Sequence, residues 1–135
     1  MSSKLQFELT SPDKLALAKP VAMVGVPGPS GMYGVMPGHA PMVTTVAPGV
    51  VEIYGDNDHT VTERVFVTGG YCEVTTEGCS ILADDILSLS ALDKKAATAE
   101  LTALTKKYDE ATTGEDRDRV QVEIDIARAK IQYAA

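Results

Sequence analysis

Apolar and polar side chains alternate along the beginning of the chain. Residues 4–9 (KLQFEL) place every apolar side chain on one side, which is the period of a strand with one buried face. Two short apolar runs follow at residues 15–17 and 21–26. They predict a further strand or a pair of strands, and Pro20 between them favours an edge strand or a bulge, because proline donates no ladder hydrogen bond.

The middle of the chain predicts two β-hairpins. Residues 50–54 and 62–67 are apolar runs on either side of a polar stretch, and residues 71–75 and 79–83 flank the turn sequence TEG. Residues 86–89 predict a last short strand. Many short strands at close spacing are typical of an all-β sandwich or of a flattened barrel.

Residues 28–48 are dense in glycine and proline. These residues favour turns, because proline fixes φ and glycine tolerates positive φ. The segment also contains many apolar side chains, in which disordered segments are poor. We therefore expect an ordered loop region here.

The composition changes after Leu92, where alanine, lysine, glutamate and leucine predominate, all good helix formers. Two apolar stripes at helical spacing follow: Ala97, Leu101, Leu104, Tyr108 and Ala111, then Val120, Ile124, Ala127, Ile131 and Ala134. Gly114 between them suits a helix end, and the acidic residues after it suit a helix start. Residues 120–126 also alternate like a strand, but the run continues without a break, so we prefer a helix. The sequence predicts an antiparallel helical hairpin, and thus two domains at residues 1–90 and 91–135.

The chain is acidic, with 19 acidic against 12 basic side chains and a net charge of −7. This is the wrong sign for a protein that neutralises phosphates, so we expect no nucleic acid partner. Most of the excess acid precedes Leu92. No apolar run of about 18 residues is present, which predicts no membrane span, and the opening residues resemble neither a secretory signal nor a transit peptide. The sequence thus favours a cytosolic location.

Few side chains form a pattern that supports catalysis. His39 has no second histidine or acid nearby in the sequence, so a partner contact, or a ring nitrogen that holds the turn, is favoured over catalysis. Asp56, Asp58 and His59 lack the acidic twelfth residue of a calcium loop and indicate a solvated hairpin tip. We expect no catalytic residue, no metal and no cofactor.

The two cysteines flank the second predicted hairpin turn. A four-residue loop places Val74 opposite Cys79, and a two-residue loop places Thr76 there. Neither register makes Cys72 and Cys79 a good disulfide pair, and neither cysteine has metal-ligand spacing. We expect two reduced thiols.

Five segments occur in the order and spacing of one family. They are residues 31–41 (GMYGVMPGHAP), 48–49 (PG), 67–74 (VTGGYCEV), 81–84 (ILAD) and 92–93 (LD). With the change from strands to helices, the chain resembles the epsilon subunit of bacterial F-type ATP synthases, the counterpart of the mitochondrial delta subunit. The resemblance covers nearly the whole chain and implies a ten-stranded β-sandwich followed by the helical hairpin.

The resemblance also implies a non-catalytic rotor subunit that couples rotation of the ring of c subunits to ATP synthesis through the gamma subunit. Residues 31–41, here named the contact segment, are expected to touch the c-ring, with Met32, Tyr33 and His39 as contact residues. The turn-forming residues of this segment are Gly31, Gly34, Pro37, Gly38 and Pro41. The expected location is the cytoplasmic face of the bacterial inner membrane, reached only through the complex.

In this family the hairpin can extend toward the catalytic ring of alpha and beta subunits and hinder ATP hydrolysis, and in some members ATP holds it down. Those members carry an arginine where this chain has Ala96. A methyl group cannot replace a guanidinium that grips phosphate. Asp93, Lys94 and Lys95 remain as possible weak nucleotide contacts, so we expect weak or no ATP binding. The alternative function is a nucleotide-sensing regulator of the same complex.

Overall fold

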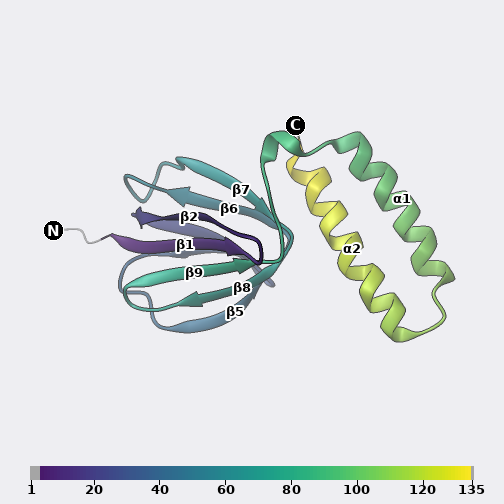
Figure 1. Cartoon of the computed structure of the whole chain (residues 1–135), viewed down its shortest axis with the longest axis horizontal. Helices are drawn as coiled ribbons and strands as arrows, with labels where there is room; N and C mark the ends of the chain where they lie inside the picture. The colour runs from purple at the N-terminus through teal and green to yellow at the C-terminus, as the bar shows by residue number, and fades with distance from the viewer. Residues whose placement is uncertain (1–3, 135) are drawn as a thin grey trace. The chain divides into compact units, whose positions relative to one another are not determined.

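The computed structural model describes residues 4–134, apart from the side chain of Lys14. It divides into two compact units, Met1–Leu87 and Ser88–Ala135. The first unit is built of strands and the second of helices (Figure 1). Each unit has its own core, and each is described separately below.

The first unit is a sandwich of two five-stranded sheets. The first sheet has the order β2-β1-β9-β8-β5, made of β1 (Leu5–Ser11), β2 (Lys14–Val21), β5 (Met42–Val46), β8 (Gly70–Val74) and β9 (Gly78–Ala83). The second sheet has the order β10-β7-β6-β3-β4, made of β3 (Met23–Gly28), β4 (Gly31–Val35), β6 (Gly49–Tyr54), β7 (Glu63–Val67) and β10 (Ile86–Leu87). The sequence predicted a sandwich or a flattened barrel, and the structure is a sandwich.

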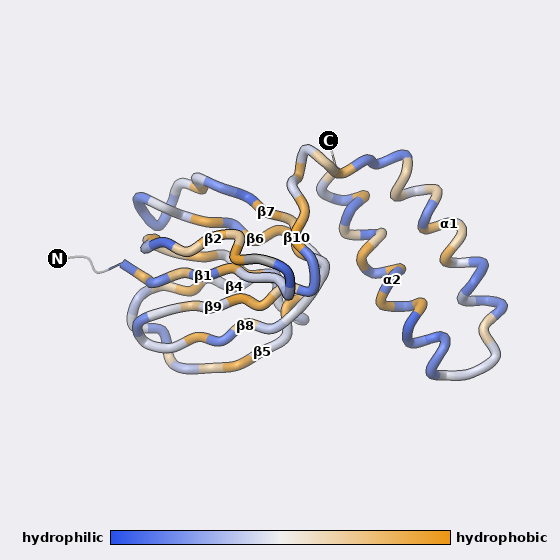
Figure 2. The backbone as a smooth tube through the Cα atoms, viewed as in Figure 1, coloured by the Kyte–Doolittle hydropathy of each residue, from blue (hydrophilic) through white to orange (hydrophobic). Residues whose placement is uncertain are grey.

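The alternating strands bury one face, as the sequence predicts. In β1, Leu5, Phe7 and Leu9 are buried and the intervening side chains are exposed, and Figure 2 shows the mixture of hydrophobic and hydrophilic positions along the strands. The core between the sheets is mainly aliphatic: Val21, Val24, Val26, Val35, Val46, Val51, Ile53, Val67, Val74 and Ile81 are all buried. Both predicted hairpins, β6–β7 and β8–β9, are present.

Pro20 lies in β2, which is an edge strand of the first sheet. An edge strand has one row of backbone groups outside the ladder, so the missing N–H of proline is tolerated there. The same strand pair contains a bulge, because Leu9 pairs with Leu17 and Thr10 pairs with Leu15. The prediction of an edge strand at Pro20 is confirmed.

The expectation of a loop throughout residues 28–48 is wrong, because two strands, β4 and β5, form within it. Glycine and proline mark the connections on either side of them, whereas the strands themselves pair with β3 and β8. The strand conformation of β4 and β5 therefore depends on their ladder partners, and the local composition of residues 28–48 did not reveal it. The predicted strand at residues 86–89 is also shorter, since β10 ends at Leu87 and a 3-10 turn, Leu89–Ala91, follows.

The second unit is a hairpin of α1 (Lys94–Glu110) and α2 (Gly114–Tyr133), which confirms the helical reading of residues 120–126. Leu104 packs with Val120, Ile124 and Ala127 from the opposite helix, as the two apolar stripes predict. Gly114 does not end the first helix. It is the first residue of α2, whose N-cap is Thr113, with the Thr113 hydroxyl accepting from the Asp116 amide at 3.1 Å.

Candidate interaction surfaces

The contact segment, residues 31–41, is half strand and half turn. Gly31 follows the β3–β4 turn and has φ of +124°, a conformation that favours glycine. Gly34 lies within β4 and pairs with Gly25, so its expected role as a turn former is wrong. A Cβ at Gly34 would lie 3.3 Å from the Met23 sulfur, which indicates that glycine here makes room for Met23 on the sheet surface.

The second half of the contact segment is a tight turn held by backbone hydrogen bonds. Gly38 has φ of +87°, and its amide donates to the Thr76 carbonyl in the β8–β9 turn at 2.9 Å. The His39 amide donates to the Met36 carbonyl at 3.1 Å. Pro41 directly precedes β5. The turn is therefore fixed to a neighbouring hairpin of the sandwich.

The three candidate contact residues have different surroundings. Met32 is 48% exposed on β4. Tyr33 instead packs against the core, with its hydroxyl buried and without a hydrogen-bond partner among the described residues. His39 lies 2.7 Å from the Ala40 carbonyl through Nδ1, which assigns the proton to Nδ1 and leaves Nε2 for a partner. The ring thus holds its own turn, as one of the two readings from the sequence states.

A cavity of about 420 Å³ opens beside the contact segment. It is lined by Gly28, Pro29, Ser30, Gly31, Met32, Tyr33, His39, Met42 and Thr44. These residues come from the end of β3, from β4, from β5 and from the turns next to them, and β4 and β5 are the last of the described strands in their sheets. The cavity therefore lies at the open edge of the sandwich.

Behind this edge, two cysteine side chains approach each other in the core. Cys72 and Cys79 are free thiols with their sulfur atoms 3.6 Å apart. The hydrogen bond from Cys79 is the main cause that lowers the pKa of Cys72 to about 7, against the effect of burial, and Tyr33 acts in the same direction. The same hydrogen bond raises the pKa of Cys79, and burial raises that of Tyr33. Neither of the two registers considered from the sequence predicted this proximity, and the structure has the one that pairs Val74 with Cys79.

The outer face of the first sheet carries a row of exposed apolar side chains that sequence reasoning missed. The ladder aligns one residue of each strand in the order Thr45, Tyr71, Leu82, Thr10 and Leu15. Tyr71 is 61% exposed, Leu82 50% and Leu15 59%. A neighbouring row adds Val43, which is 72% exposed. Apolar residues at outward positions of alternating strands were the available signal. We name Leu15, Val43, Tyr71 and Leu82 the outer apolar row.

The carboxylate of Asp93, a candidate nucleotide contact, is already engaged. Asp93 is the N-cap of α1, and its Oδ1 accepts from the amides of Lys95 at 2.9 Å and Ala96 at 3.2 Å. The first amides of a helix are where an anion would bind. Lys94 and Lys95 are exposed, so the lysines alone remain for a phosphate.

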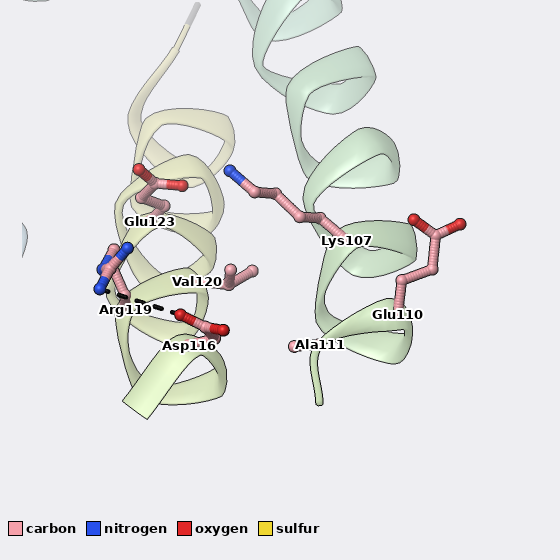
Figure 3. A pocket seen from close by; sticks show the side chains of 7 residues that line it. All are labelled: Lys107, Glu110, Ala111, Asp116, Arg119, Val120 and Glu123. Atoms are coloured by element: carbon pink, nitrogen blue, oxygen red, sulfur yellow. Dashed lines mark ion pairs between the residues drawn. The ribbon is translucent and has the colours of Figure 1, made fainter. Parts of the chain in front are cut away.

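A second cavity, of about 310 Å³, lies at the tip of the helical hairpin. Figure 3 shows that its charged groups come from both helices, with Lys107 of α1 reaching toward α2. On α2, Arg119 lies 3.8 Å from Asp116. The lining mixes both signs of charge, and Val120 is its one buried apolar member. Because both acidic and basic side chains line this cavity, its lining favours neither an anionic nor a cationic ligand.

No three His, Cys, Asp or Glu side chains within residues 4–134 converge as metal ligands. At the β6–β7 tip, the Asn57 side chain accepts from the amides of His59 and Thr60, so this loop is organised by its own hydrogen bonds. None of the helices described is long and apolar enough to span a bilayer.

Comparison with known proteins shows the family of the chain. Residues 4–88 match the model of the family described as the ATP synthase delta/epsilon chain, beta-sandwich domain. The ATP synthase epsilon chain of Rhodospirillum centenum is 44% identical over 138 aligned positions, covering all of this chain and 94% of the relative. That of Rhodospirillum rubrum is 44% identical over 113 positions, covering 84% and 83%.

Solved structures share the fold. A chain in the cryo-EM structure of the Euglena gracilis mitochondrial ATP synthase, OSCP/F1/c-ring, is similar with a TM-score of 0.79 and 21% identity, over 96% of this chain and 80% of that one. A chain in the Tetrahymena thermophila central stalk/c-ring structure has a TM-score of 0.69 and 15% identity, over 99% and 98%.

The family model and these relatives together define the chain as a non-catalytic stalk subunit of an ATP synthase. Within that class, the chain belongs to the family of ATP synthase epsilon chains, which are subunits of the central stalk of F-type ATP synthases. This confirms the family that the sequence resembles.

Proposed function

We propose that this chain joins the gamma subunit to the c-ring and transmits rotation between them, from a peripheral position on the cytoplasmic face of the bacterial membrane. The outer apolar row is the observation that supports this best. Large apolar side chains that remain exposed on a folded sheet mark an interaction surface. Here they lie on four strands, β2, β5, β8 and β9, of one hydrogen-bonded five-stranded sheet, which gives a rigid platform.

The outer apolar row is the surface we assign to gamma. Tyr71 and Leu82 lie at its centre, where interface residues contribute most to affinity. Glu73 pairs with Val43, and Glu8 lies in the same row of the ladder through Ser80. The partner surface should therefore be apolar at its centre, with basic side chains around it.

The contact segment is the surface we assign to the c-ring. Met32 is exposed, whereas Tyr33 supports the strand from inside. The hydrogen bond from the Gly38 amide to the Thr76 carbonyl anchors the turn to the β8–β9 hairpin. A surface that transmits torque needs side chains held by a stiff scaffold, and both halves of this segment meet that need.

The helical hairpin is the regulatory part of the proposal. Its interface consists of few side chains, with Leu104, Val120, Ile124 and Ala127 at the centre. A small core of this kind gives up little apolar contact when the helices change partners. We propose that the hairpin can reach the catalytic ring of alpha and beta subunits and hinder ATP hydrolysis. Since Asp93 is engaged in capping and Ala96 offers no charge, it does so without a tightly bound nucleotide.

The platform is tested by placing a charge on it. Replacing Leu82→Lys in the full chain should weaken binding to purified gamma at least tenfold, about 1.4 kcal/mol, because an ammonium group would have to be desolvated at the interface centre. Thr60→Lys adds the same charge on the exposed β6–β7 loop and should leave binding unchanged. Binding is measured by titration calorimetry. Equal affinities for the two variants would refute the assignment of this face.

A further inference from the structure

Two thiols lie together inside the sandwich, behind the contact segment. Cys72 on β8 is 0% exposed and Cys79 on β9 is 2% exposed, with their sulfur atoms 3.6 Å apart. They are diagonal neighbours in the ladder, because Cys72 lies opposite Ile81 and Cys79 lies opposite Val74. The proposed function uses neither thiol.

The surroundings of the two sulfur atoms are unequal. The two thiols share one hydrogen bond in which either sulfur could be the donor. The hydrogen bond to Cys79 is the main cause that lowers the pKa of Cys72 to about 7, and the buried Tyr33 hydroxyl also lowers the pKa of Cys72. The thiolate is the nucleophilic form of cysteine. Cys72 is therefore the attacking sulfur of the pair, and Cys79 is the one that keeps its proton.

A small molecule has a short route to this pair. Tyr33 and Thr44 line the cavity at the open edge of the sandwich. Thr44 on β5 is the ladder partner of Cys72, and β4 and β5 are edge strands with no further strand beyond them. A slight separation of these two strands would admit a molecule with the size of hydrogen peroxide.

We propose that Cys72 and Cys79 form a redox-active pair that hydrogen peroxide converts to a disulfide. The Cys72 thiolate attacks one peroxide oxygen, the O–O bond breaks, and the departing hydroxide takes up a proton to become water. Cys72 is then a sulfenic acid. The Cys79 sulfur attacks the Cys72 sulfur and loses its proton, while the S–O bond breaks and a second water leaves. Two thiols are oxidised and one peroxide is reduced to two waters.

Disulfide formation would change the position of the turn that connects β8 and β9. A disulfide requires the sulfur atoms to approach to about 2.05 Å, and diagonal neighbours lie farther apart than facing pairs, so β8 and β9 must shift. Their connecting turn provides the Thr76 carbonyl that accepts from the Gly38 amide. Oxidation should therefore weaken this anchor of the contact segment. Any effect on c-ring binding rests on the proposed function, whereas the oxidation itself does not.

The chemistry is tested on the purified full chain with hydrogen peroxide and mass spectrometry. We expect the chain to lose the mass of two hydrogen atoms, a peptide that links Cys72 to Cys79, and full reversal by dithiothreitol. In the Cys79→Ser variant the reaction should stop at a sulfenic acid on Cys72, which dimedone traps. If both thiols persist in the wild-type chain at a dose that oxidises the exposed Met32 and Met36, the proposal is wrong. Sulfonic acids without a disulfide would also refute it.

Tyr33 and the turn provide two further readouts. Tyr33→Phe removes the hydroxyl and should slow disulfide formation severalfold, whereas Tyr71→Phe makes the same change on the outer face of β8 and should not. Hydrogen exchange at the Gly38 amide should accelerate in the oxidised chain. An unchanged Gly38 amide would show that the disulfide does not reach the contact segment.

Discussion

The sandwich and the helical hairpin solve the problem of burial in different ways. In the sandwich, two sheets enclose a continuous core in which most side chains are fully buried. In the hairpin, two helices meet along one narrow stripe, on which Leu104 remains 8% exposed. The first arrangement resists deformation, and the second can separate at a modest cost. The proposed rotor subunit with a regulatory hairpin would use this division.

The largest expected effect comes from a cavity in the sandwich. Ile53→Ala should lower the free energy of unfolding of the sandwich by about 3 kcal/mol, because Ile53 is fully buried and the surroundings of a truncated core side chain relax only in part. Urea denaturation followed by hydrogen exchange of the strands measures the change. Val122→Ala removes a 57% exposed side chain of α2 and provides the control, with a change within about 0.5 kcal/mol.

A smaller effect, confined to the hairpin, is expected from Leu104→Ala. Leu104 packs against residues of α2 and retains some exposure, so the loss should be about 2 kcal/mol, near the low end for leucine truncation. The amides of α1 and α2 should then exchange faster while those of the sandwich strands keep their protection. If strand amides lost protection to the same degree, the two units would unfold together and the comparison would fail.

The residues that the sequence placed correctly are those whose neighbours lie close along the chain. The alternation of Leu5, Phe7 and Leu9 was sufficient for β1, because the period of a strand is a local property. The stripes of Leu104 and Ile124 likewise identified the helices. The same kind of signal left the fold open between a sandwich and a flattened barrel, and the β8–β9 hairpin open between two registers, of which the structure has the one that pairs Val74 with Cys79.

The features that the sequence did not show depend on distant partners. β4 and β5 exist because β3 and β8 complete their ladders, and the parallel pairing of β1 with β9 joins segments far apart in the chain. The inward direction of Tyr33 depends on which face of β4 meets the core. The thiol proximity depends on the side-chain directions of Cys72 and Cys79, which register alone does not fix.

The smallest effect concerns the start of the hairpin. Asp93→Ala removes the acceptor of the Lys95 and Ala96 amides and should destabilise α1 by about 1 kcal/mol, whereas Asp93→Asn keeps an N-cap acceptor and should cost less. Limited proteolysis within α1 measures the difference.

The same assay with millimolar ATP separates the capping role of Asp93 from nucleotide binding. ATP should protect neither the wild-type chain nor Asp93→Asn. The first amides of α1 already donate to the residue 93 side chain, and position 96 is an alanine, not an arginine. Protection of the wild-type hairpin by ATP, lost in both variants, would instead identify Asp93 as a nucleotide contact. The hairpin would then be a sensor, and its weak core would be the element that the nucleotide holds closed.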